Sequence, residues 1–179
     1  MSLFGEARDI SLFRHINREL INNIIEQQVG YYKIILDRTT PNMYGEASGT
    51  KFYYDPVLIN CLIERTPPTW ESGDFGPDVQ QDLTVRFLRD DLAGIDLSVE
   101  FSDGSKGSFY GVVPEVGDIM VWDNDYYEVD GVVENQYVMG KNPSYSFSSD
   151  NDNFGNSLSI IVSSHNVRPE RLGFTQERI

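Results

Sequence analysis

The chain has few of the residues from which most metal and nucleophilic sites are built. Its 179 residues include one cysteine, Cys61, and two histidines, His15 and His165. A single cysteine excludes an intrachain disulfide, which is typical of a protein made in a reducing compartment. Because Cys61 lies in an apolar run, it is expected to serve as a small buried hydrophobe. We therefore expect neither a Cys–His nucleophile pair nor a tetrahedral zinc site.

Basic residues are also scarce. The chain has 14 Lys and Arg against 28 Asp and Glu, which gives a net charge of −14. Proteins bind nucleic acid mainly by neutralising phosphates with Lys and Arg, and no run of these residues is present. Two interpretations of the acidity stay open: it serves solubility alone, or it forms a wall along which DNA passes without sticking.

Long apolar stretches are missing as well. Segment 57–63 is too short to cross a bilayer and contains Asn60. The first residues lack the basic start and apolar core of a signal peptide. We expect a soluble protein made in the cytoplasm, with no membrane partner.

No complete catalytic or cofactor motif is found. Segment 45–51 resembles a phosphate loop, but its glycine spacing is one residue short and its Lys and Thr are in the wrong order. Segment 150–155 begins like a calcium loop, but Phe154 stands where an oxygen ligand is needed. We predict no catalytic, cofactor-binding or metal-binding residues. Carboxylates are abundant, so a small hydrolase that uses a carboxylate pair stays open as an alternative function.

Aromatic residues and turn formers, by contrast, are plentiful. The chain has ten Tyr, ten Phe, 15 Gly and eight Pro, which favours strands and turns over a helical bundle. In segment 79–88, Leu83, Val85 and Phe87 alternate with polar residues and point to one side of a strand. Further strands are expected at 31–36, 51–65 and 158–164, and long loops at 37–50 and 66–78.

Segment 114–129 carries the clearest hairpin signal. Pro114 and Gly117 mark a turn, and Asp118 opens an apolar strand. Segment 123–125 turns the chain back into a second strand. Since such a hairpin often closes a small barrel, we predict a mainly β fold. It is a small β-barrel or sandwich with one N-terminal amphipathic helix, long loops and an extended C-terminal arm.

The amphipathic helix is expected at about 11–28. Apolar residues recur there every three or four positions, and Gly30 stands where a C-terminal cap belongs. Such a helix packs either on the core of its own domain or on a neighbouring subunit. The width of the apolar face favours the core helix.

We predict a single β-rich domain at 1–165 and a C-terminal arm at 166–179. In the arm, Arg168, Arg171 and Arg178 outnumber the two glutamates, and Pro169 disfavours a regular element. A slightly basic tail on an acidic body suggests an assembly arm that lies over an acidic neighbouring subunit. A frayed terminus is the alternative.

Several motifs, in this order, resemble the neck proteins of contractile-tailed, T-even-like bacteriophages. The resemblance rests on segment 24–29 with Tyr31-Tyr32-Lys33, on Asn42-Met43-Tyr44-Gly45-Glu46, and on the strand at 56–64. Segment 114–129 matches the Pro-x-x-Gly-Asp hairpin of phage head-to-tail connector barrels.

The resemblance implies a structural protein without enzymatic activity. Such proteins form a ring in the virion neck, between the capsid portal and the tail, and are assembled in the host cytoplasm. The implied partners are copies of the chain itself, portal or adaptor proteins, and tail-terminator or sheath-side proteins. Genomic DNA passes through without specific binding. A baseplate or tail-completion adaptor with a similar barrel is the nearest alternative.

Interface residues are expected in the two long loops and the arm. They are Tyr44, Gly45 and Glu46, then Trp70 and Phe75, then Arg168, Arg171 and Arg178. Gly45 would permit a backbone turn closed to other residues, although a purely local turn is equally consistent with this segment. Trp70 must either bury its ring or offer it to a partner.

The charge balance predicts that the isolated protein does not bind duplex DNA. Even non-specific binders make several phosphate contacts through Lys or Arg, with dissociation constants of roughly 1–100 μM at physiological salt. An anisotropy titration to about 100 μM protein should therefore show no saturable, salt-sensitive signal. Saturable DNA binding in the micromolar range would mean that the folded protein has a basic surface that the charge balance of the sequence does not reveal.

Overall fold

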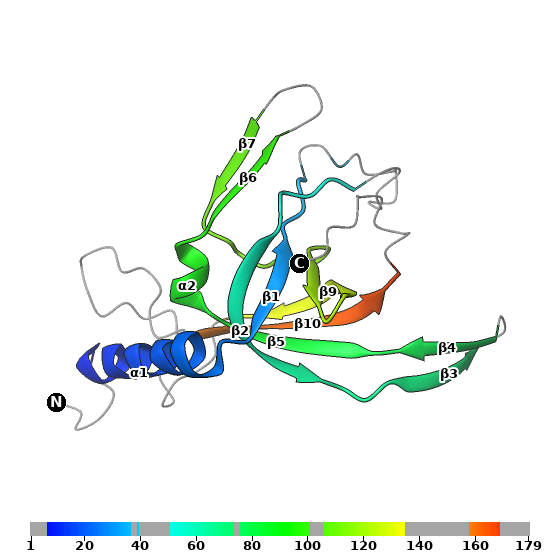
Figure 1. Ribbon diagram of the computed structural model, residues 1–179, viewed down its shortest axis with the longest axis horizontal. Helices are drawn as coiled ribbons and strands as arrows, with labels where there is room; N and C mark the ends of the chain where they lie inside the picture. The colour runs from blue at the N-terminus through cyan, green and yellow to red at the C-terminus, as the bar shows by residue number, and fades with distance from the viewer. Residues whose placement is uncertain are drawn as a thin grey trace.

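The computed structural model describes residues 7–36, 39, 51–73, 76–100, 106–134 and 158–168. Six antiparallel strands close into a barrel in the order β1-β2-β5-β10-β9-β8 (Figure 1). These strands are β1 (Gln28–Tyr32), β2 (Val57–Arg65), β5 (Asp82–Leu88), β8 (Ile119–Trp122), β9 (Asp125–Val133) and β10 (Ser159–Val167). The predicted mainly β class is confirmed, and the architecture is a barrel rather than a sandwich.

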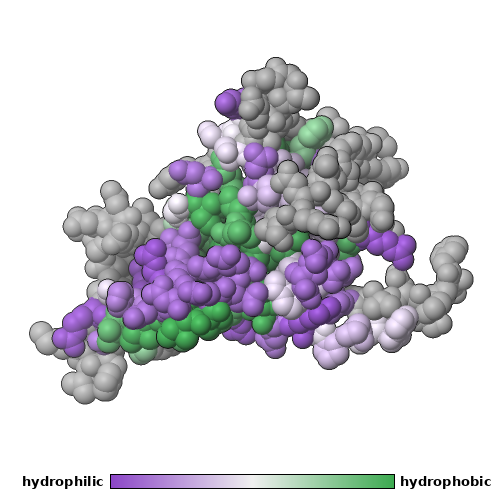
Figure 2. Space-filling model, in the orientation of Figure 1, coloured by the Kyte–Doolittle hydropathy of each residue, from purple (hydrophilic) through white to green (hydrophobic). Residues whose placement is uncertain are grey.

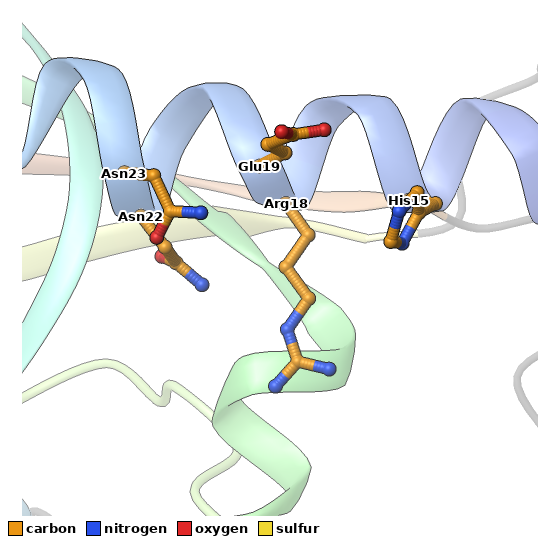
Figure 3. A pocket seen from close by; sticks show the side chains of 5 residues that line it. All are labelled: His15, Arg18, Glu19, Asn22 and Asn23. Atoms are coloured by element: carbon orange, nitrogen blue, oxygen red, sulfur yellow. The ribbon is translucent and has the colours of Figure 1, made fainter.

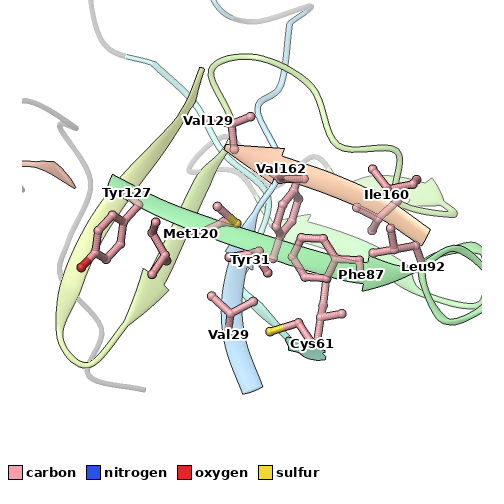
Figure 4. Packing of buried hydrophobic residues seen from close by; sticks show 14 of the residues in the cluster. Val29, Tyr31, Cys61, Phe87, Leu92, Met120, Tyr127, Val129, Ile160 and Val162 are labelled. Atoms are coloured by element: carbon pink, nitrogen blue, oxygen red, sulfur yellow. The ribbon is translucent and has the colours of Figure 1, made fainter. Parts of the chain in front are cut away.

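The period-two alternation of the strands fills the barrel with apolar side chains. Leu83, Val85 and Phe87 of β5 are fully buried, as their spacing predicts. Ile160 and Val162 of β10 lie in the same cluster (Figure 4). Because each of the six strands pairs on both sides, the barrel itself has no free edge.

The predicted hairpin is formed by β8 and β9. Asp123 (φ 53°) and Asn124 (φ 65°) occupy the two turn positions between the paired residues Trp122 and Asp125. Both turn residues are left-handed, as in a type I′ turn, whose twist matches that of the flanking strands. Asp and Asn tolerate this conformation better than other non-glycine residues.

The carboxylate of Asp118 holds the seam between β1 and β8. It is fully buried and accepts a hydrogen bond from the Tyr31 hydroxyl and one from the Ile34 backbone N–H, at 2.9 Å. It also accepts one from the Glu115 backbone N–H at 2.8 Å, which closes the turn that Gly117 allows with its φ of +95°. The Pro-x-x-Gly-Asp sequence is therefore a structural motif that ties β8 to β1.

Lys33 supplies the opposite charge at this seam. Its Nζ lies 3.1 Å from Asp118 Oδ2 and 2.8 Å from Glu115 Oε2, and the side chain is almost completely buried. Burial raises the pKa of Asp118, and the Lys33 charge and the hydrogen bonds oppose this rise. Burial, followed by the nearby Asp118 charge, also raises the pKa of the Tyr31 phenol, which stays protonated as a donor.

The prediction of a long loop at 66–78 is wrong. The chain there forms a hairpin of β3 (Thr69–Gly73) and β4 (Gly76–Gln80), paired from Thr69↔Gln80 to Gly73↔Gly76. The glycines that suggested a loop lie at the tip of the hairpin. Pro77 is tolerated because each strand of a two-stranded sheet has an outer edge that needs no partner.

A second hairpin leaves the barrel after α2 (Arg89–Ala93). It pairs β6 (Asp96–Glu100) with β7 (Lys106–Tyr110), and it is also separate from the barrel sheet (Figure 1). Leu92 of α2, Leu97 of β6 and Val112 are all buried in the main core cluster. These three side chains extend the core beyond the barrel strands.

The N-terminal helix starts and ends earlier than predicted. It consists of α1 (Ala7–Glu19) and a π-helical turn, η1 (Leu20–Ile25). Glu26 ends it in the left-handed conformation (φ 50°) and donates its N–H to Ile21 O at 3.0 Å. The prediction of Gly30 as the cap is wrong, because Gly30 already pairs with Leu58 and Val121 inside the barrel.

The last strand crosses the predicted boundary between domain and arm. β10 includes Asn166 and Val167, so regular structure continues past the expected arm start at 166. Residues 169–179 lie outside the described part of the chain. The division into a domain at 1–165 and an arm at 166–179 stays a prediction.

Replacing Asp118 by Asn should destabilise the barrel by about 3 kcal/mol, because it removes the buried charge that faces Lys33. Urea unfolding measures the loss. Asp123→Asn is the matched control: that side chain is exposed on the turn, and Asn accepts its left-handed backbone, so stability should stay within about 0.5 kcal/mol. Equal stabilities of the two variants would contradict the role given to Asp118.

Candidate assembly surface

The helix formed by α1 and η1 exposes most of its large apolar side chains. Ile24 is 70% exposed and Leu12 56%, whereas Ile21 is buried. Figure 2 shows the resulting apolar band along α1, below a polar region. We call this surface the helix stripe; its exposed residues are Leu12, Phe13, Ile16, Leu20, Ile24 and Ile25. The favoured prediction of a core helix is therefore wrong.

The polar side of the helix contacts α2. Arg18 Nε lies 3.0 Å from Asp91 Oδ1, and Asn22 Nδ2 donates to Asp91 Oδ2 at 2.9 Å. One turn earlier, Arg14 Nε lies 3.8 Å from Asp90 Oδ2. Since residues four apart share one side of a helix, these three side chains form one polar row. With this row against α2, the apolar side lies on another, exposed side of the helix.

The polar row contributes less free energy than burial of the helix stripe would. An ion pair at the solvent edge, such as that of Arg18 with Asp91, contributes about 0.2–1 kcal/mol. Complete burial of one Leu, Ile or Phe side chain contributes about 1.5–3 kcal/mol. The helix stripe therefore holds far more unused binding free energy than the polar row supplies. Apolar patches of this kind are typical of protein–protein contact sites.

A polar pocket lies beside the row. Its lining residues are His15, Arg18, Glu19, Asn22 and Asn23 (Figure 3). Arg18 extends toward α2, and both Arg18 and Asn22 already bind Asp91. All five lining residues belong to α1 and η1, and two of them are already engaged by α2.

The described residues offer little for metal chemistry. Within them, no group of three or more His, Cys, Asp and Glu side chains is arranged to hold a metal ion. Cys61 is fully buried, and burial raises the pKa of its thiol to about 12. His165 Nδ1 lies 2.7 Å from Asp130 Oδ1 in an exposed pair.

The structure describes two of the eight interface residues expected from sequence. Trp70 lies on β3 and is 73% exposed, so its ring is offered to the surroundings. Arg168 follows β10 and is exposed. The other six lie outside the described residues: Tyr44, Gly45, Glu46, Phe75, Arg171 and Arg178.

Sequence reasoning missed the contact between the helix and α2. The available signals were the four-residue spacing of Arg14, Arg18 and Asn22, and the neighbouring acids Asp90 and Asp91. The two acids stand about 70 residues further along the chain, and no local pattern links them to the helix. Their role in the structure is to anchor the helix.

No protein-family model matches the chain, and no curated protein matches it. In the part of the chain that the structure describes, no helix combines the length and the apolar character needed to cross a membrane.

Asp91→Ala should loosen the helix without opening the barrel, because Asp91 binds both Arg18 and Asn22. We expect hydrogen exchange in α1 to become about tenfold faster, while exchange in β5 and β10 stays unchanged. Asp90→Ala is the matched control, since its pair with Arg14 is longer and Asp90 is more exposed than Asp91. An equal response to both substitutions would show that Asp91 is not the anchor.

Proposed function

We propose that this chain is a structural subunit of a bacteriophage neck. It forms a ring that joins the capsid portal to the tail and lets DNA pass. The observation that carries the proposal is the helix stripe, since an exposed apolar helix face suits an assembly subunit. The resemblance of the sequence to phage neck proteins, described above, supports the neck of the virion as the location of this assembly.

The arrangement of the elements supports a ring. The core lies in a closed barrel, and three elements project from it: the N-terminal helix and the hairpins β3–β4 and β6–β7 (Figure 1). Projecting elements can reach neighbours while the barrel stays unchanged. Identical subunits joined head to tail through two different surfaces form a ring when the rotation from one subunit to the next adds up to a full circle.

The charge of the chain supports the passage of DNA. A subunit with a net charge of −14 repels the phosphate backbone wherever its acidic side chains face the duplex. Asp90 and Asp91 are engaged with the helix, so the lumen of the ring would be lined by other acidic residues. An acidic lumen keeps DNA moving during packaging and ejection.

The proposal is tested by mixing the purified protein with the portal and tail-completion proteins of its phage. Light scattering should show a particle whose mass is a multiple of 20.4 kDa, or the mass of a partner plus such a multiple, and negative-stain images should show rings. Ile24→Asp should reduce ring formation at least tenfold, because it places a charge in the helix stripe. Val133→Asp, at an exposed apolar position on β9, is the matched control and should assemble normally.

A protein that stays monomeric with every partner would contradict the proposal. Selective joining to baseplate proteins would instead identify an adaptor of the baseplate. If Ile24→Asp and Val133→Asp unfold at the same temperature, any loss of assembly in Ile24→Asp comes from its changed surface and not from a destabilised fold.

A further inference from the structure

The hairpin β3–β4 projects from the barrel at the end opposite to the N-terminal helix. Figure 1 is drawn with the longest axis horizontal, and α1 and this hairpin lie at its two ends. The two elements therefore cannot touch within one copy. A contact between them would have to join two copies.

The hairpin carries an apolar group that suits the helix stripe. Trp70, on β3, is 73% exposed. A two-stranded hairpin alone is only marginally stable in water and gains stability by packing on another element. Tryptophan is among the residues that most often anchor protein interfaces, because it buries a large rigid surface.

The helix lacks the net negative charge that the chain as a whole carries. The segment Ala7–Ile25 has three arginines against two acidic residues, although the whole chain has a net charge of −14. The segment Thr69–Gln80 has three acidic residues and neither Lys nor Arg. Arg8 is 93% exposed, whereas Arg14 and Arg18 pair with Asp90 and Asp91 of α2, so the helix with these partners is close to neutral. The helix is thus a surface that an acidic hairpin can approach without net repulsion.

We infer that the β3–β4 hairpin of one copy packs Trp70 against the helix stripe of the next copy. This inference rests on the proposed ring and names the contact that closes it. The occupant of the stripe is a second copy of this chain, because the matching apolar and acidic element lies at the far end of the same molecule. Each copy then offers one helix stripe and one hairpin, so the contact repeats from head to tail.

The test uses two variants that each block one end. Ile24→Asp blocks the stripe, and Trp70→Asp blocks the hairpin; both side chains are about 70% exposed or more, so the fold should survive. Each variant alone should fail to form rings. Mixed together, they should form a 1:1 dimer and nothing larger, because one intact stripe then meets one intact hairpin.

The mixture is measured by sedimentation at up to about 100-fold the concentration at which the unmodified protein forms rings, since a single contact lacks the gain from ring closure. Trp70→Phe, which keeps an aromatic ring, should assemble like the unmodified protein. Rings formed by Trp70→Asp, or no dimer in the mixture, would overturn the inference. Dimers of Trp70→Asp alone would mean that the stripe binds another stripe. If the unmodified protein never assembles with any partner, the proposed function fails as well.

Discussion

The buried carboxylate of Asp118 is the constraint from which the rest of the architecture follows. Removing a charge from water costs several kcal/mol, and here Lys33 and hydrogen-bond donors from both sides of the seam offset that cost. Those donors are in place only when the end of β1 lies beside the start of β8, so one buried group sets how the barrel closes. Because the closed barrel has no free edge, neighbouring copies cannot join it by extending its sheet. In the proposed ring, contacts between copies would come from the elements that project.

The N-terminal helix is an example of a projecting element whose orientation is fixed by its own chain. Its polar row binds α2 through Asp90 and Asp91, and this contact orients the helix before any neighbour arrives. A helix held in its bound position loses less conformational entropy on binding, which leaves more of the apolar contact free energy for affinity. The rigid barrel underneath gives the orientation its precision. An outward apolar side on a helix anchored in this way suits the proposed assembly subunit.

The sequence predicts this fold well where a local pattern has one meaning. Leu83, Val85 and Phe87 alternate, and they are buried as expected. Asp123 and Asn124 form the turn that their positions indicate. The hairpin β3–β4 was missed because Gly73 and Gly76 mark a loop and a hairpin tip equally well. The helix pattern shows that an apolar side exists, but not which way it faces, because the deciding acids stand in α2, far along the chain. The expected interface loop around Tyr44 lies outside the described residues.

Charge decides what kind of contact can hold such subunits together. Two bodies with a net charge of −14 each repel one another at long range, but at physiological salt this repulsion is screened beyond about 8 Å. Apolar contact acts only at closer range, so it can dominate once the surfaces meet. Because Arg14 and Arg18 offset Asp90 and Asp91 of α2, the helix adds little to this repulsion. In the proposed ring, acidic surfaces would keep free copies apart at long range, and the apolar helix stripe would be the place where two copies come into close contact.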